Sequence, residues 1–402
     1  MKRVNLKFVT LLYLAAMVAL HAIFFWTLRH EVRRGYSDFA IFYSAGRIVG
    51  QGRGHDLYDG ELQFRTQQEF APDVRIRQGA LPYNHPPFEA LIFVPFAWLK
   101  YFPAYLLWDS ISLMILISLP LLLRPHVALL RLLPAPSCVL ATLAFFPVFV
   151  ALLQGQDIVV LLLLLSLTYV SLKKNAESAA GCWLGLGLFR FHLVLPLAVM
   201  LCLKKRKAAM GFAVVAMLLG LISIAVVGWR TTLAYPGYVL HLEVMGGNGS
   251  IVPADMPNLR GLLDTLPHLH HLRVILTVAS SLIMFVLAFA KWKPDATEST
   301  FDLGFALVIV VTVLVSYHAL AYDLTLLLLP ILLVVNRLKT TWPVRKPVAL
   351  LAPIMVLSFS PMLMFLTLRA RQTNLLALVL LLWAWGVWRE IQRIERFPGS
   401  AT

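Results

Sequence analysis

The chain has 402 residues, of which 59% are hydrophobic and only 14% are charged, and its formal net charge is +15. Soluble domains carry about 25% charged residues, so this composition excludes an ordinary soluble protein. The positive charge does not indicate nucleic-acid binding, because basic residues gather in short segments between long apolar runs. That distribution is typical of the loops that orient membrane proteins.

Apolar runs recur along the chain, and many approach the roughly 20 residues that a helix needs to cross a bilayer. The long runs are 8–28, 104–123, 136–153, 208–228, 272–290, 347–368 and 373–389; shorter ones are 157–172, 302–316 and 320–335. In lipid, a helix pairs its own backbone polar groups. We therefore predict an all-α integral membrane protein with a single domain over 1–402.

Basic clusters in the loops predict the topology. After Lys2, Arg3 and Lys7 they fall at Arg124/Arg131, Lys173/Lys174, Lys204–Lys207, Lys291/Lys293, Arg337–Lys346 and Arg389–Arg396. All lie inside the cell if 86–101 does not cross the membrane and 180–203 forms a helical hairpin turning at 189–192. This arrangement predicts about twelve membrane helices, with long outer loops at 29–102 and 229–271.

The first outer loop begins with an acid beside the membrane. From Asp38 to Val49, apolar residues recur at helical spacing, which predicts a short helix on the membrane surface. Ser37 is a good N-cap, and Asp38 then lies in the first turn, where the helix dipole favours its ionised form. An acid at such a position is often only a cap; the alternative is a catalytic base.

Two further polar groups lie at predicted membrane boundaries. Tyr83 and His85 precede a pair of prolines and are either interfacial residues or ligands for a polar substrate. Gln154 and Gln156 lie between two apolar runs. Their amides either turn the chain or bind sugar hydroxyls, since an amide offers both donors and acceptors.

Charged residues also interrupt the apolar runs themselves. A charge near the bilayer centre costs about 2.5–3.5 kcal/mol, so such a residue usually meets a partner. Arg190 and His192 at the predicted hairpin tip can meet a phosphate or reach the membrane interface. His318 and Asp323 are functional candidates for the same reason. No Asp-x-Asp pair occurs in the sequence, and one carboxylate rarely holds a divalent ion alone, so we predict no metal.

Several short motifs occur in a recognisable order. They are Asp38-Phe39-x-x-Phe42-Tyr43-x-Ala45, Gly52, Leu57-Tyr58, Tyr83-x-x-Pro86-Pro87, Gln154-x-Gln156, Asn258-Leu259-Arg260-Gly261 and Tyr322-Asp323. This order, over about 1–335, resembles glycosyltransferase family 87, also called DUF2029. The family includes mycobacterial mannosyltransferases that extend phosphatidylinositol mannosides, and it is similar to polyprenyl-phosphate-dependent GT-C glycosyltransferases. The resemblance implies a GT-C bundle whose first outer loop carries an essential Asp, and Asp38 matches that position.

The resemblance and the residues together predict the reaction. A hexose, mannose by analogy with the family, would pass from a polyprenyl-phosphate donor to a glycolipid or glycan acceptor at the outer face of the plasma membrane. Asp38 would be the general base of an inverting transfer that needs no cofactor. Phosphate binding is assigned to Arg190, His192, Arg260 and His318, and sugar or acceptor binding to Tyr43, Tyr83, His85, Gln154, Gln156, Asn258, Tyr322 and Asp323.

One departure from the family pattern concerns the hairpin. Many relatives have Lys-Pro where this chain has Arg190-Phe191-His192, and a guanidinium makes forked contacts that an ammonium does not. Two other functions remain open from the sequence. A secondary transporter or lipid-linked sugar carrier also uses broken helices with buried charges, and a membrane scaffold needs no catalytic residue.

Overall fold

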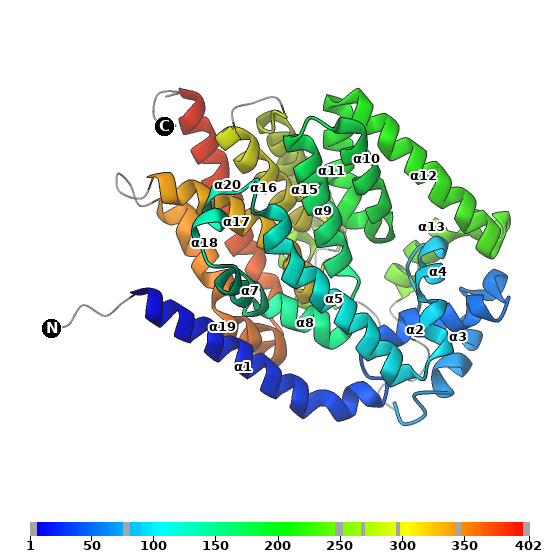
Figure 1. The fold of residues 1–402 in the computed structure, drawn as a ribbon. Helices are drawn as coiled ribbons and strands as arrows, with labels where there is room; N and C mark the ends of the chain where they lie inside the picture. The colour runs from blue at the N-terminus through cyan, green and yellow to red at the C-terminus, as the bar shows by residue number, and fades with distance from the viewer. Residues whose placement is uncertain are drawn as a thin grey trace.

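The computed structural model describes residues 6–74, 81–245, 252–266, 270–294, 298–341 and 347–396. Within these ranges the chain forms helices and no strands, which confirms the predicted all-α fold (Figure 1). Eight helices are long and apolar enough to cross a membrane, or up to ten if two bent helix pairs each form one span. The chain is therefore a multi-pass membrane protein, but the predicted count of about twelve helices is not confirmed.

The long helices are α1 (Leu6–Arg33), α5 (Tyr101–Leu123), α12 (Arg206–Val227), α15 (His270–Lys291), α16 (Glu298–Val315) and α20 (Leu376–Arg396). A further helix of spanning length is formed by η6 (Ala321–Leu327), which continues into α17 (Leu328–Thr341). The bent pairs are α7 (Ala135–Leu143) with α8 (Phe146–Gln154), and α18 (Val348–Ser358) with α19 (Ser360–Met364) and η7 (Phe365–Ala370). Shorter elements are α6 (Ala128–Leu132), α9 (Ile158–Lys173), α13 (Trp229–Met245), η5 (Pro253–Asp255), α14 (Leu259–Leu263) and η8 (Thr373–Leu375).

A helical hairpin interrupts the series of spans, as predicted. It consists of α10 (Glu177–Leu186), η4 (Gly187–Arg190) and α11 (Phe191–Lys204). The segment is long enough to cross the membrane once. Its two ends meet instead, because the Glu177 carboxylate lies 2.9 Å from Nζ of Lys205. Each arm is shorter than the roughly 20 residues of a full span, so the tip at Arg190 ends at membrane depth.

Small residues hold the hairpin against α12. A Cβ on Gly211 of α12 would lie 2.2 Å from the carbonyl oxygen of Ser178, and one on Gly181 would lie 2.0 Å from that of Ala208. The two backbones are therefore as close as glycine permits. Membrane helices pack through such small residues because lipid supplies no hydrophobic force between them.

This contact gives a first prediction. Replacing Gly211 with Ala should lower the free energy of unfolding by about 1–3 kcal/mol, because the added methyl group meets a backbone atom that cannot move independently. Gly220 is the matched control, since it lies in the same helix and a Cβ there meets nothing within 4 Å. Gly220→Ala should be neutral or stabilise by up to about 1 kcal/mol, because glycine weakens a helix interior. Unfolding in detergent measures both; equal effects would refute the close contact.

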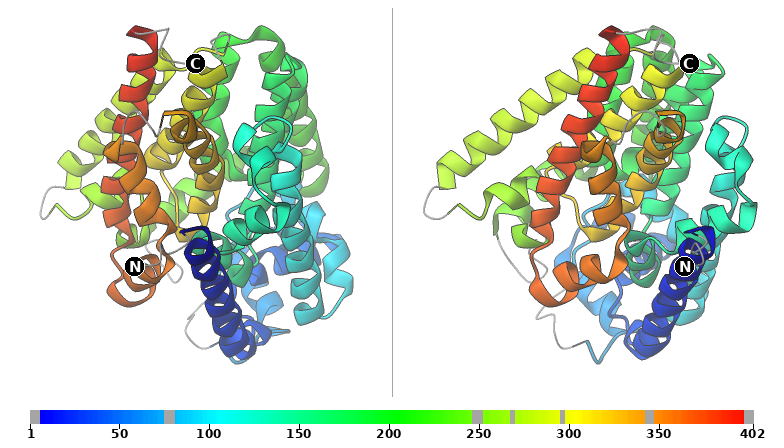
Figure 2. Two further views of the ribbon diagram at one scale, coloured as in Figure 1. Left: turned by 60° about the vertical axis from the view of Figure 1, so that its left-hand side comes forward. Right: turned by 90° about the vertical axis from the view of Figure 1, so that its left-hand side faces the viewer.

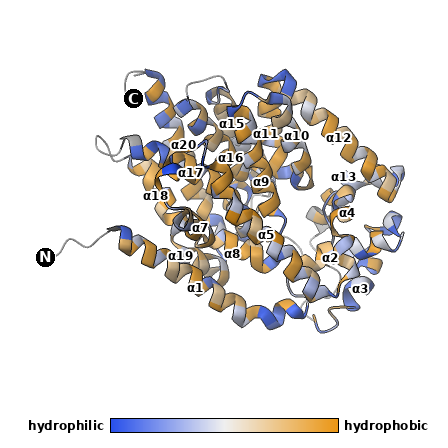
Figure 3. Ribbon diagram, viewed as in Figure 1, coloured by the Kyte–Doolittle hydropathy of each residue, from blue (hydrophilic) through white to orange (hydrophobic). Residues whose placement is uncertain are grey.

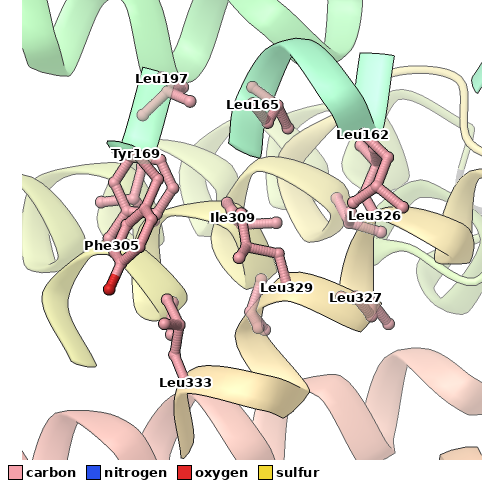
Figure 4. Close-up of a cluster of buried hydrophobic side chains, with 14 of the residues drawn as sticks. Leu162, Leu165, Tyr169, Leu197, Phe305, Ile309, Leu326, Leu327, Leu329 and Leu333 are labelled. Atoms are coloured by element: carbon pink, nitrogen blue, oxygen red, sulfur yellow. The ribbon is translucent and has the colours of Figure 1, made fainter. Parts of the chain in front are cut away.

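The core of the bundle lies around α16, whose described side chains are almost all buried. Figure 4 shows Phe305 and Ile309 of α16 among Leu162 and Leu165 of α9 and Leu333 of α17. In contrast, α1 and α15 leave most of their residues exposed. Their exposed side chains are largely apolar, which suits contact with lipid (Figure 3).

Four of the basic clusters predicted to lie on one side contribute contacts between helix ends at one end of the bundle. Ion pairs connect Lys173 of α9 with Glu298 of α16 (2.6 Å), Lys291 at the end of α15 with Glu395 of α20 (2.7 Å), and Arg337 of α17 with Glu390 of α20 (3.7 Å). The Lys204 ammonium contacts the carbonyl oxygens of Phe289 and Trp292. Lys2, Arg3, Arg345 and Lys346 of the prediction lie outside the described residues.

The segment between α1 and α5 lies at the other end, far from the C-terminal end of α20 (Figure 2). It forms α2 (Phe39–Gly50), η1 (Gly54–Asp56), α3 (Gly60–Gln68), η2 (Pro87–Glu89), α4 (Ala90–Phe93) and η3 (Pro95–Trp98). The pieces between 87 and 98 are too short to span, which confirms that 86–101 does not cross.

The predicted helix after Asp38 exists, but it is not a one-sided surface helix. Almost all of α2 is buried, including Phe39 and Phe42, because the 87–98 pieces and α5 pack against it. The prediction that Ser37 caps this helix is wrong. Asp38 occupies the N-cap, and the Ser37 hydroxyl is instead hydrogen-bonded to the Tyr101 hydroxyl at 2.8 Å.

Candidate active site

A tight turn between α8 and α9 positions two glutamines against α2. Gly155 has a φ of +61°, which favours glycine, and a Cβ there would lie 2.8 Å from Cβ of Phe39. The Trp108 indole donates a hydrogen bond to the Gly155 carbonyl oxygen at 3.0 Å, and the Tyr105 hydroxyl donates to that of Leu152 at 2.9 Å. These contacts from α5 fix the turn beside the start of α2.

Both glutamines hold Asp38. The backbone N–H of Asp38 donates to Oε1 of Gln154 at 2.9 Å, and the Gln156 amide donates to Oδ2 of Asp38 at 2.8 Å. The structure thus brings Asp38 together with two predicted site residues that lie 116 and 118 positions later in the sequence. Their amides were predicted to contact sugar, whereas these hydrogen bonds go to the candidate base.

Arg190 lies next in this polar network. Its Nε donates to Oδ1 of Asp157 at 2.7 Å, its Nη1 donates to Oδ1 of Asp323 at 3.4 Å, and its Nη2 contacts the Gln156 amide oxygen. The side chain is 2% exposed. The Tyr322 ring centre lies 5.4 Å from the guanidinium carbon. Two buried carboxylates therefore balance the charge of Arg190, which leaves little of it for a phosphate.

An imidazole pair lies beside this network. The ring centres of His192, at the start of α11, and His318, between α16 and η6, are 5.7 Å apart. Burial lowers the pKa of His318 to about 3, so its imidazole is neutral near neutral pH. Arg260 is near the same segment, because its guanidinium donates to the carbonyl oxygen of Tyr317 at 2.9 Å. Three of the four predicted phosphate ligands thus lie near one another, around the segment 317–318.

The first loop contributes a further cluster. Nδ1 of His85 lies 2.8 Å from Oε2 of Glu89 and 3.9 Å from Oδ2 of Asp157, and the Tyr83 hydroxyl lies 3.4 Å from Oε2 of Glu89. Burial lowers the pKa of His85 to about 4 and raises the pKa of Glu89 to about 7. The ligand atoms of His85, Glu89 and Asp157 all lie within 4.8 Å of one another, close enough to hold a metal ion.

Glu89 and Asp157 were not among the predicted site residues. A sequence signal for Glu89 existed: it follows His85 by four residues, which places both on one side of a helical turn. Asp157 follows Gln156 directly, but nothing in the sequence shows that it pairs with Arg190.

Two predicted site residues have structural roles in the described fold. Tyr43 donates its hydroxyl to the carbonyl oxygen of Leu99 at 2.7 Å, and its ring packs against Phe70 and Tyr101. Asn258 caps α14, because its side-chain oxygen accepts from the backbone N–H of Gly261 at 2.9 Å. Its amide also donates to the Ser316 carbonyl oxygen at 2.8 Å.

The model of glycosyltransferase family 87 matches residues 83–317. The chain belongs to this family. The family 87 match supports a glycosyltransferase that acts on a sugar donor and an acceptor. It covers the turn at 154–157 and the hairpin tip at 190, whereas Asp38 and Asp323 lie outside the matched residues. No curated protein matches the chain.

Gln156 gives a prediction for this family 87 site. Gln156→Leu removes the link between Arg190 and Asp38, so turnover should fall by about tenfold to a hundredfold while donor KM changes little, because a small misplacement of a reacting group is costly. Gln156→Glu places a carboxylate beside Asp38. Because like charges favour protonated Asp38, the acid limb of the pH–kcat profile should move to higher pH.

The pH–rate profile distinguishes this positioning role from a merely structural one. Gln51→Leu is the control, because Gln51 is exposed at the end of α2. If Gln156→Glu were less active with an unmoved pH profile, Gln156 would not act through Asp38. If Gln156→Leu raised only KM, the residue would bind substrate instead.

Proposed function

We propose that this family 87 protein transfers a hexose from a polyprenyl-phosphate donor to a hydroxyl of a glycolipid or glycan. The sugar is mannose if the resemblance to mannosyltransferases extends to the donor. The proposal rests mainly on one observation: the Asp38 carboxylate accepts a hydrogen bond from Gln156, which also contacts Arg190, and a pair of buried imidazoles lies near this network. A base and anion-binding groups thus share one end of a membrane bundle.

In the proposed step, the acceptor oxygen attacks the anomeric carbon as the bond from that carbon to the phosphate oxygen breaks. The bonding electron pair leaves with the phosphate, and the hydroxyl proton passes to Asp38. The products are a glycoside and polyprenyl phosphate. A single displacement inverts the anomeric centre. A correctly placed base contributes about 10²–10⁴-fold to such a rate.

Negative charge grows on the phosphate as the bond breaks, so hydrogen-bond donors there stabilise the transition state more than the ground state. His192, His318 and Arg260 supply them, because Arg190 is occupied by Asp157 and Asp323. A neutral imidazole donates through one ring nitrogen. Arg190 then acts by holding the carboxylates and Gln156 in position, which revises its predicted contact with phosphate.

The lipid tail of the donor must remain in the bilayer while its phosphate reaches the site. The outer face of α12 suits this, because Met217, Leu218 and Leu221 are largely exposed. We place the site at the extracytoplasmic face of the plasma membrane, within a GT-C bundle. The support is that the basic clusters occupy the opposite end of the molecule, and basic loops remain in the cytoplasm.

The test is sugar transfer by the purified full-length protein in liposomes. Radiolabelled polyprenyl-phosphate mannose and a mixed glycolipid acceptor fraction are supplied, and labelled product is extracted. Label in a new glycolipid supports the proposal. Movement of the donor across the bilayer without a new product would indicate a carrier, and label from a nucleotide sugar alone would reject the lipid-linked donor.

A further inference from the structure

A three-residue cluster beside the candidate base has no role in the proposed transfer step. It consists of His85, before η2, Glu89, at the end of η2, and Asp157, before α9. Their side chains are 10%, 1% and 3% exposed. Two carboxylates and an imidazole thus converge from segments separated by about seventy residues in the chain. Burying such groups costs free energy unless each finds a partner.

Three polar atoms of this cluster lack a hydrogen-bond partner among the described residues. They are Nδ1 of His85, Oε1 of Glu89 and Oδ2 of Asp157. The 2.8 Å approach of His85 to Glu89 is close, but it is not a well-aligned hydrogen bond. Buried polar atoms in proteins are nearly always paired, so three unpaired ones in one buried cluster indicate a ligand.

The local charge points to a positive ligand. Asp157 and Asp323 bind Arg190, while Asp38 is connected to Arg190 through Gln156. With Glu89, four carboxyl groups lie around one guanidinium. An excess of buried negative charge is unfavourable. It is also a poor environment for a phosphate.

We propose that His85, Glu89 and Asp157 bind a divalent cation. Ligands at 2.0–2.1 Å in octahedral geometry lie about 3.0 Å apart when adjacent and about 4.2 Å apart when opposite. The distances of 2.8 and 3.9 Å from His85 and the 4.8 Å limit on the cluster need only small adjustments to match. Carboxylate oxygens with one imidazole suit a cation such as Mn²⁺.

Neighbouring residues hold these ligands in place. Arg190 binds Oδ1 of Asp157, so Oδ2 faces the cluster. The Tyr83 hydroxyl lies 3.4 Å from Oε2 of Glu89, and the edge-on Phe42 ring lies 4.9 Å from the His85 ring. Such contacts orient metal ligands and typically change affinity by about 10–100-fold. This proposal replaces the sequence-based expectation that no metal is bound.

Binding itself does not depend on the proposed function. A role for the cation in sugar transfer does depend on the proposed function. The cation would offset the negative charge of the carboxylates near the donor phosphate, so removing the cation with a chelator should slow transfer. Direct binding and transfer are therefore measured separately, so that failure of one does not decide the other.

The binding experiment uses Mn²⁺ and the full-length protein in nanodiscs. Electron paramagnetic resonance should show one tightly bound Mn²⁺ per chain, with at least tenfold weaker binding in Glu89→Gln and in His85→Gln. Mn²⁺ should also raise the melting temperature of the wild type, because it binds the folded state. Glu61→Gln is the matched control, since the Glu61 side chain is 80% exposed.

Three results would overturn the proposal. One is the absence of stoichiometric Mn²⁺ in the wild type at millimolar concentration, which needs no variant to interpret. Another is unchanged binding in folded Glu89→Gln and His85→Gln. The third is an infrared band of a protonated carboxyl, absent in Glu89→Gln, that persists in saturating Mn²⁺; a proton between Glu89 and Asp157 would then be the partner of the cluster.

Discussion

Asp38→Asn should lower sugar transfer by about 10²–10⁴-fold, because asparagine cannot accept the proton of the acceptor hydroxyl. The fold should be retained. The Asp38 side chain makes no capping hydrogen bond to α2, and the side-chain oxygen of asparagine can still accept the hydrogen bond from Gln156. Donor KM should change little, since the base acts on the acceptor. Initial rates with a radiolabelled lipid-linked donor measure the effect.

Asp73→Asn is the matched control for this prediction. Asp73 lies in the same loop, its side chain is 68% exposed, and its closest ion pair, with Arg34, is 3.8 Å long. Such a surface pair contributes little, so the variant should keep wild-type rates. Transfer at more than a tenth of the wild-type rate by folded Asp38→Asn would exclude Asp38 as the base, although the family assignment would remain.

Much of the fold was predictable because each feature leaves a local signal. The spans follow from apolar length, the hairpin from Arg190 and His192 in the middle of a run, and the non-spanning 86–101 from its prolines. The helix count was not predictable, because apolar length alone cannot show that α7 and α8 meet at 67° or that α18 meets the following segment Ser360–Ala370 at 66°. Those angles depend on packing between distant helices.

The site was predictable in part. Acidic, amide and basic residues at membrane depth pointed to Asp38, Gln156 and Arg190, because such residues are rare there without a function. Their partners were not predictable. Arg190 contacts Asp157 and Asp323, which lie in two other segments of the chain, so the spacing of these residues in the sequence does not indicate the contact. Tyr43 was misleading, since an aromatic with a hydroxyl is compatible with both packing and binding.

Arg190→Met should produce the largest loss of stability, about 3–5 kcal/mol in the free energy of unfolding. Methionine fills similar space but leaves Asp157 and Asp323 without their cation, and their side chains are 3% and 0% exposed. Removing one partner of a buried ion pair costs more than removing the pair, because the remaining charge has neither water nor partner. Adding Asp157→Asn and Asp323→Asn to Arg190→Met should therefore recover much of the loss.

Arg190→Lys tests geometry separately from charge. Lysine keeps the positive charge but cannot form the forked contact to Asp157, Asp323 and Gln156 at once, so its loss should be intermediate. The control is Arg273→Met, because Arg273 pairs with Asp264 at 2.8 Å on the partly exposed part of α15, where a pair contributes about 0–1 kcal/mol. Equal losses for Arg190→Met and Arg273→Met in detergent would mean that the buried carboxyls are already neutral without Arg190. The network that orients Asp38 would then not depend on the guanidinium charge.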